Sequence, residues 1–184
     1  YDASENILIE APCPMRQIEP RFHAQIDQWL DALAGSRAPL LREWLSWVTD
    51  LSRPATAIFL DGTPGAGKSL FANGLARIWT KGPPTTLEQA MGGKSQWNDA
   101  LMRCPLVFAD ERVPKDFRGG ARTEDLREFI QQRERPLHRR FQNDSVLKGA
   151  TRLVIASNNR SLLQTGDAHL TANDIQAIAD RTLW

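Results

Sequence analysis

The sequence predicts an α/β protein whose central, mostly parallel sheet is flanked by helices and preceded by a short helical segment. Apolar runs of strand length alternate with segments that fit helices, which is the order that builds a parallel sheet. Polar residues follow each run directly. The three runs are Ala57–Leu60, Pro105–Ala109 and Arg152–Ala156. Ligands of such sheets bind beyond the carboxyl ends of the strands, so the polar residues there form the candidate site.

Length and charge bound the function before any motif is considered. The 184 residues have the size of one domain, in which we expect an N-terminal segment (1–52) and a core (53–184). The 23 basic and 22 acidic residues give a net charge of +1, so nucleic acid would have to bind a local basic patch. The sequence starts without a methionine and stops at Trp184, and we interpret it as part of a longer protein.

Cysteine usage and hydropathy favour a cytoplasmic protein with no membrane segment. Cys13 and Cys104 are too far apart in the sequence for a zinc-ligand spacing or a disulfide framework, which fits a reducing compartment. Cys104 opens an apolar run and is predicted to be buried. No apolar run approaches the roughly 20 residues that cross a bilayer, and no signal peptide is visible.

The segment before the first strand is predicted to be helical from Phe22 to about Leu51, with a turn at Gly35–Pro39. Its apolar residues recur at helical spacing on two faces. The first face is Ile26, Trp29, Leu30 and Leu33, and the second is Leu40, Leu41, Trp44, Leu45 and Val48. We expect the tryptophans of this region to pack in the interior; they are Trp29, Trp44 and Trp47.

Further helices and a hairpin are predicted after the first strand, from apolar periodicity and from residues that cap helices or form turns. In chain order they are a helix of about residues 68–79, a helix that Thr123 can cap, a hairpin of 136–141 and 146–148 around the polar tip 142–145, and a helix from about 171 to 181.

The segment Gly62–Ser69, here called the glycine loop, fits the pattern G-x-x-x-x-G-K-[ST] in full. Backbone N–H groups of such a loop can wrap a phosphate, and the helix that begins near Lys68 adds the positive end of its dipole. Lys68 should reach the β- and γ-phosphates of ATP, and the Ser69 hydroxyl should bind Mg²⁺. The nucleotide-binding residues that we predict are Gly62, Thr63, Pro64, Gly65, Ala66, Gly67, Lys68, Ser69 and Leu70.

Polar residues at the ends of the other two strands complete the predicted site for ATP hydrolysis. Asp110 can hold Mg²⁺ together with Ser69, and Glu111 is placed to orient or deprotonate the attacking water. Asn158 can position that water or sense the γ-phosphate, and Asn159 is the weaker candidate for this role.

Basic residues gather between the second and third strands, where the hairpin can present them to a phosphate backbone. The candidates for nucleic-acid binding are Arg139, Arg140 and Lys148. The alternative, which the sequence leaves open, is that they form a solvated face of the hairpin. His138 is interpreted as a surface residue, because the histidines show no metal-ligand spacing.

In the order of its motifs the chain resembles the superfamily 3 helicases of small viruses, and more closely the AAA+-like helicase modules of phage and plasmid primase-helicases. The resemblance covers about Trp29 to Trp184 and rests on the glycine loop, an acidic pair after an apolar strand, a strand that ends in Ser157-Asn158, and a later arginine, Arg181. It implies a P-loop fold of the AAA+ type, and an Arg181 that neutralises charge on the γ-phosphate, often in a neighbouring subunit. The hairpin tip departs from the family because it carries no lysine.

The function that we expect is the ATP-hydrolysing motor of a replicative DNA helicase, with ATP and Mg²⁺ as cofactors. The resemblance implies a hexameric ring on single-stranded DNA and a fused or associated primase, encoded by a phage or mobile element in a bacterial host cell. One alternative is another AAA+-like ATPase that processes DNA or loads a helicase. A second is an ATP-gated binding switch, against which Glu111 argues, because a pure switch needs no base.

Overall fold

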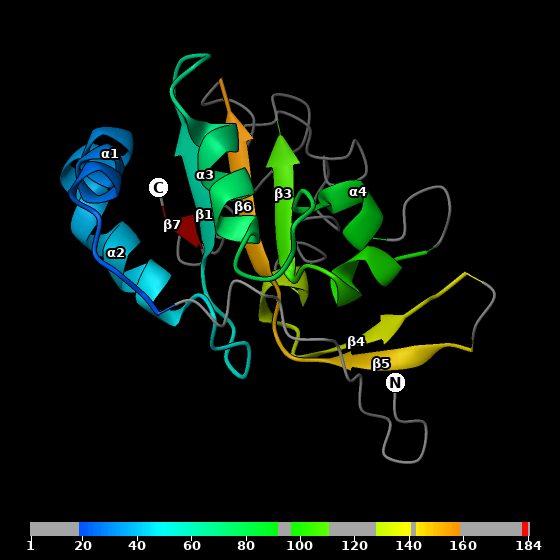
Figure 1. The fold of residues 1–184 in the computed structure, drawn as a ribbon. Helices are drawn as coiled ribbons and strands as arrows, with labels where there is room; N and C mark the ends of the chain where they lie inside the picture. The colour runs from blue at the N-terminus through cyan, green and yellow to red at the C-terminus, as the bar shows by residue number, and fades with distance from the viewer. Residues whose placement is uncertain (1–18, 92–96, 111–127, 141–142, 159–181, 184) are drawn as a thin grey trace.

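The computed structural model describes residues 19–91, 97–110, 128–140, 143–158 and 182–183, and every structural statement below concerns these residues. Their helices and strands are shown in Figure 1. In chain order they are α1 (Ala24–Ala34), the 3-10 turn η2 (Gly35–Arg37), α2 (Ala38–Trp47), β1 (Ala57–Asp61), α3 (Lys68–Ala76), β2 (Thr85–Thr86), α4 (Leu87–Ala90), the 3-10 turn η3 (Asp99–Met102), β3 (Leu106–Asp110), β4 (Glu134–Leu137), β5 (Ser145–Lys148), β6 (Arg152–Ser157) and β7 (Thr182–Leu183).

Five parallel strands form the central sheet in the order β2-β3-β6-β1-β7 (Figure 1). The three apolar runs of the sequence are its three middle strands, because β6 pairs with β3 on one side and with β1 on the other. The register brings the strand ends together, with Asp61 opposite Ser157 and Asp110 opposite Ala156. The predicted α/β class with a mostly parallel sheet is confirmed, and the polar strand ends lie at one end of that sheet.

Both faces of the sheet are buried, because successive strand residues point to opposite sides and join different clusters. Along β1, Ile58 and Leu60 pack in the cluster that contains α2 and α3, whereas Ala57 and Phe59 pack in the cluster that contains α4. Strands buried on both sides are near-continuous apolar runs, and this explains why these strands could be recognised in the sequence although β6 begins with Arg152. Cys104 is buried, as predicted.

Helices α1 and α2 form a pair that packs against the sheet beside β1 (Figure 1). Arg42 of α2 holds α1 through two carboxylates, Asp27 and Asp31, at 2.8 Å each. The residues of α2 and its C-terminal cap that join the core of the sheet are Leu41, Trp44 and Val48. The second apolar face predicted from periodicity therefore supplies the buried residues of this contact, and partly buried residues of the first face pack against the same cluster: Trp29, Leu30 and Leu33.

Two expectations for this helical pair were wrong in detail. The turn ends at Arg37, and Pro39 already lies in the first turn of α2, where proline's missing N–H leaves no hydrogen bond unmade. Trp47, expected in the interior, is 49% exposed, and its ring lies 5.3 Å from the guanidinium carbon of Arg53. Ile26 and Leu40 are also exposed, and Leu40 lies at the margin of its apolar stripe.

Arg152, at the start of β6, is the largest fully buried side chain among the described residues. Its guanidinium donates hydrogen bonds to backbone carbonyls at the end of α2 and in the turn that follows. The acceptors are the carbonyl oxygens of Trp47 (3.3 Å), Val48 (3.1 Å), Asp50 and Arg53 (3.0 Å). Burial lowers the pKa of Arg152, and the nearby Asp50 opposes that shift. The arginine thus fixes the C-terminal end of α2 to the middle strand of the sheet.

Other element bounds differ from the prediction for local reasons. Helix α3 ends at Ala76, before the predicted residue 79, because Ile78 and Trp79 donate to carbonyls three residues back and tighten the last turn. The strands β2 and β7 were not predicted, since two-residue strands carry no periodicity. The hairpin is present, but β4 begins at Glu134, two residues before the predicted start.

The two later helices fall largely or wholly outside the described residues. Of the helix expected from Thr123, residues 128–131 are described and are helical. The helix expected at 171–181 lies outside the described residues. No helix in the part of the chain that the structure describes is long and apolar enough to span a bilayer.

Candidate functional site

The glycine loop joins β1 to α3 at the carboxyl end of the sheet (Figure 1). Gly65 and Gly67 have φ values of 82° and 92°, which a residue with a side chain adopts only with strain. The N–H of Gly62 donates to the carbonyl of Ser157 at 3.3 Å, so the start of the loop is tied to the end of β6. Gly67 is the N-cap of α3, and the free N–H groups of a helix start are donors for an anion.

Lys68 is only 7% exposed, although it carries a positive charge. Its ammonium donates to the carbonyl oxygens of Gly62 at 2.6 Å and Thr63 at 3.0 Å, and to Oδ1 of Asn158 at 2.7 Å. All three acceptors are uncharged, so the positive charge of Lys68 is solvated but not neutralised by them. A group that carries negative charge would therefore gain from approaching this ammonium.

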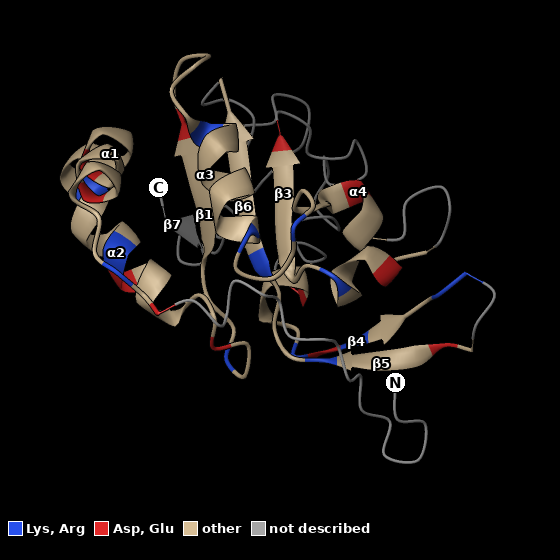
Figure 2. Ribbon diagram, viewed as in Figure 1, with Lys and Arg blue, Asp and Glu red and all other residues tan. Residues whose placement is uncertain are grey.

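Ser69 and Asp110 lie side by side, with Oγ of Ser69 3.5 Å from Oδ2 of Asp110. Both are exposed, and Figure 2 shows acidic residues at the tips of β1 and β3 and a basic residue at the start of α3. A hydroxyl and a carboxylate are hard oxygen donors of the kind that Mg²⁺ binds, usually with water and phosphate oxygens as its other ligands. A magnesium site of this kind needs only one or two protein ligands. The described residues contain no group of three or more His, Cys, Asp or Glu side chains that could hold a metal ion by themselves.

The remaining predicted nucleotide-binding residues border the same loop. Thr63, Pro64, Gly65 and Ala66 are exposed, and Leu70 is a large apolar side chain that is 65% exposed at the first turn of α3. The loop is therefore open to solvent. Three predicted residues lie outside the described residues: Glu111, Asn159 and Arg181.

Trp29 lies against the glycine loop, a contact that sequence reasoning missed. A Cβ atom at Gly67 would lie 3.3 Å from Nε1 of Trp29, so the indole occupies the space beside this glycine. The ring also packs against Phe71 of α3, with ring centroids 6.2 Å apart. Periodicity placed Trp29 on an apolar face, but it carries no signal for which distant residue that face meets.

The hairpin β4–β5 projects at the lower right of the sheet in Figure 1, away from the glycine loop at the top. Of the predicted nucleic-acid residues, Arg140 and Lys148 are exposed and Arg139 is half-buried. Arg139 donates to the carbonyl of Asn143 at 3.0 Å. His138, predicted to be a surface residue, is partly exposed and pairs with Asp144 at 3.0 Å. Basic side chains are therefore exposed on the hairpin, at a distance from the glycine loop.

Two buried polar side chains anchor the hairpin to the core. Arg135 is 5% exposed, stacks on the ring of Phe129 at 3.9 Å, and donates to the carbonyl of Phe129 at 3.0 Å. Burial lowers the pKa of Arg135 to about 10. Asn98 donates to the carbonyl of Pro136 at 2.9 Å and accepts from the backbone N–H of His138 at 2.7 Å. Neither side chain was predicted to have this role. The contacts of Asn98 join segments 38 and 40 positions apart, which local patterns do not relate, whereas Phe129 lies only six positions before Arg135.

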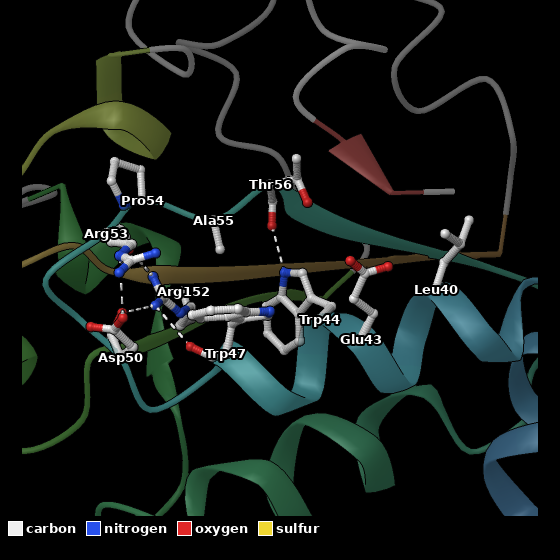
Figure 3. Close-up of a pocket in the computed structure, with 10 residues that line it drawn as sticks. All are labelled: Leu40, Glu43, Trp44, Trp47, Asp50, Arg53, Pro54, Ala55, Thr56 and Arg152. Atoms are coloured by element: carbon white, nitrogen blue, oxygen red, sulfur yellow. Dashed lines mark hydrogen bonds and ion pairs between the residues drawn. The ribbon is translucent and has the colours of Figure 1, made fainter.

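A pocket of about 370 Å³ lies beside α2, at the end of β1 opposite the glycine loop (Figure 3). One wall is Trp44, whose indole N–H donates to the carbonyl of Thr56 at 2.8 Å. Trp47 and Arg53, which stack on each other, also line the pocket, as does Arg152. None of the predicted site residues lines this pocket, so it is separate from the glycine-loop site.

One family model matches residues 60–171, which is more than half of the chain; the family is described as a family of unknown function, DUF5906. The matched segment runs from the end of β1 through the glycine loop and the hairpin to beyond β6. No curated protein matches the sequence.

Solved structures of the NrS-1 C-terminal region are similar to this chain. The apo structure of that region (305–718) is 18% identical with a TM-score of 0.66, and the alignment covers 93% of this chain and 47% of that one. An A-form apo structure is also 18% identical, with a TM-score of 0.62 and coverage of 93% and 46%. This chain thus spans about half the length of those structures, and the likeness concerns the fold. A JCV helicase structure with a bound small molecule is 15% identical over 83% of this chain and 46% of its own, and its TM-score of 0.45 carries no weight.

Proposed function

The chain belongs to DUF5906, a family of unknown function, and we propose that it is the ATP-hydrolysing motor domain of a DNA helicase. One observation carries the proposal: the ammonium of Lys68 lies 2.7 Å from Oδ1 of Asn158. The two residues were selected from separate motifs 90 positions apart, one in the glycine loop and one after β6. Their meeting at the carboxyl end of the sheet supports a common role, because ligands of parallel sheets bind there.

In this proposal the glycine loop and α3 bind the phosphates of ATP. The N–H groups of the loop and of the first turn of α3 would donate to phosphate oxygens, and Lys68 would move from its carbonyl partners to the β- and γ-phosphates. The exposed Leu70 would border the nucleotide. The uncharged acceptors around Lys68 support this step, since a phosphate offers the ammonium a stronger partner than a carbonyl.

Ser69 and Asp110 would hold Mg²⁺, which supplies positive charge to the phosphates when bound. Glu111 would take the proton of the attacking water, whose oxygen bonds to the γ-phosphorus while the bond to the bridging oxygen breaks, giving ADP and phosphate. Asn158 would orient that water or report on the γ-phosphate. Arg181 of a neighbouring copy would neutralise the charge that develops on the γ-phosphate. This role requires head-to-tail contacts between copies, which close into a ring, and we propose a hexamer.

Single-stranded DNA is the proposed track, and a fused or associated primase the proposed partner. Arg140 and Lys148 support DNA binding because they are exposed on a hairpin anchored to the core, and the half-buried Arg139 precedes Arg140 in the sequence. The fold likeness to the NrS-1 C-terminal region is compatible with this proposal but identifies no substrate. The competing assignment to another DNA-processing or helicase-loading ATPase shares the same ATP chemistry, so DNA-dependent turnover separates the two.

The test is ATP hydrolysis by the purified protein with and without single-stranded DNA, for the wild type, Glu111→Gln and Arg140→Ala/Lys148→Ala. We expect turnover that DNA stimulates several-fold, and at least about a 100-fold loss in Glu111→Gln, which removes the base. The double hairpin variant should keep its basal turnover and lose the stimulation by DNA.

Two results would count against the proposal. Absence of ATP hydrolysis in the wild type under all DNA conditions would refute the enzymatic part. Turnover that is identical with and without DNA would reject the helicase assignment in favour of another ATPase. A control with Glu43→Gln, an exposed acid on α2, should leave both rates unchanged.

A further inference from the structure

We infer that Trp29 of α1 is a positioning residue of the proposed nucleotide site, and that it couples nucleotide binding to the N-terminal helical pair. This inference rests on the proposed function, because it assigns a role at the same loop. Its first observation is the close approach at Gly67, where a Cβ would lie 3.3 Å from Nε1 and 3.5 Å from Cζ2 of Trp29. A side chain at Gly67 would have to displace the indole as well as adopt a strained φ of 92°.

The second observation is that Trp29 spans the start of α3. Besides Gly67 it contacts Phe71, whose ring is tilted by 37° to the indole. Phe71 is buried, and its N–H donates to the carbonyl of Gly67 at 2.9 Å, in the first turn of the helix. Trp29 therefore touches the residues on both sides of Lys68 and Ser69, the two that would meet the phosphates and Mg²⁺.

The third observation is that α1 is itself held in place. Arg42 of α2 pairs with Asp27 and Asp31, which flank Trp29 on α1. The end of α2 is in turn fixed to β6 by the hydrogen bonds of Arg152. A continuous series of direct contacts thus leads from the middle strand of the sheet, through both helices, to the glycine loop.

These contacts have a consequence for ligand binding. The indole fills the space next to Gly67, so the loop cannot shift toward α1 unless Trp29 moves with it. A loop held in this way has less conformational entropy to lose when it closes on phosphate. Without the indole, part of the binding free energy of the nucleotide would be used to order the loop, so the affinity would fall. The groups that react would be unchanged, so kcat would stay nearly the same.

The experiment measures ATP affinity by calorimetry and steady-state hydrolysis for Trp29→Ala, Trp29→Phe and a control, Trp47→Ala. We expect Trp29→Ala to raise both Kd and KM for ATP about tenfold, equivalent to about 1.4 kcal/mol, with kcat changed less than about twofold. Trp29→Phe keeps a ring against Phe71 and Gly67 and should recover most of the affinity. Trp47 is an exposed tryptophan on α2 beside the separate pocket, so its removal should leave Kd unchanged.

A spectroscopic signal keeps the inference testable if Trp29→Ala folds poorly. The emission of Trp29 is the difference between the wild-type and Trp29→Phe spectra, and it should change when ATP is added. An unchanged Kd in Trp29→Ala, or a Trp29 emission that does not respond to ATP bound by the wild type, overturns the inference alone. A wild type that does not bind ATP overturns the proposed function, and the inference with it.

Discussion

Two buried cations lie at opposite ends of the central sheet and differ in the groups that accept their hydrogen bonds. Lys68, at the carboxyl end, is 7% exposed and donates to two loop carbonyls and a side-chain amide. Arg152, at the amino end of β6, is 1% exposed and donates to four carbonyls around the end of α2. Among the described residues, neither cation donates a hydrogen bond to a carboxylate.

The difference lies in how readily the acceptors can be exchanged. The carbonyls around Arg152 belong to a helix end and its turn, which pack on the sheet and would lose their donors in the interior if the arginine left. The acceptors of Lys68 belong to a solvent-exposed loop and to Asn158, which is also exposed. A lysine ammonium is a compact charge on a flexible chain, whereas a guanidinium is a planar fork with fixed donors. A buried positive charge therefore has a structural role at Arg152, whereas at Lys68 its acceptors can be exchanged for a ligand.

The largest expected effect of breaking this contrast is at Lys68. We predict that Lys68→Ala reduces ATP hydrolysis at least about 100-fold, since the variant loses the charge that would meet the β- and γ-phosphates. Its free energy of unfolding should change by less than about 1 kcal/mol, because the loop carbonyls it leaves can bind water. Hydrolysis rates together with urea unfolding test both parts. A stable variant with near wild-type turnover would contradict the assignment of Lys68.

The next largest effect is at Arg152, where we expect a large loss of stability, in contrast to the loss of activity expected at Lys68. We predict that Arg152→Met lowers the free energy of unfolding by about 3 kcal/mol, because several buried carbonyls lose their donors and methionine can replace only the volume. Urea unfolding measures this loss. The matched control is Arg53→Met, because the Arg53 side chain is 69% exposed and its ion pair with Asp50 at 3.6 Å should contribute under about 0.5 kcal/mol. Equal stability of the two variants would show that Arg152 does not lock α2 to the sheet.

The sequence predicted those features of the fold and site that are local. The three middle strands and the hairpin follow from short patterns of apolar and turn residues, and the structure confirms them. The structure also has the glycine loop between β1 and α3, as its pattern predicts. Lys68 was chosen because it belongs to the glycine-loop pattern and Asn158 because it follows a strand, and parallel pairing of β1 with β6 brings the two together. The chemical roles of these residues remain predictions.

The features that sequence reasoning missed depend on contacts between distant segments. In the sequence, Arg152 is only the polar start of a strand. No local pattern indicates that its guanidinium donates hydrogen bonds to backbone carbonyls at and after the end of α2, about 100 positions earlier. Trp29 and Trp47 have the same residue type and lie on neighbouring helices, yet one meets the glycine loop and the other is half exposed. Helical periodicity gives the direction of a side chain but not the residue that it meets.

The smallest expected effect sharpens the contrast at the Lys68 end by removing one acceptor. In Asn158→Ala the ammonium of Lys68 keeps both carbonyl partners, so we predict that ATP binding stays within about twofold of wild type. The rate kcat should fall about tenfold, because the proposed role of the amide is to orient the attacking water. Asn143→Ala, on the hairpin, is the control and should leave both quantities unchanged. If Asn158→Ala instead raised the Kd for ATP with kcat intact, Asn158 would serve to position Lys68 for the phosphates, and the water would have to be oriented by another group.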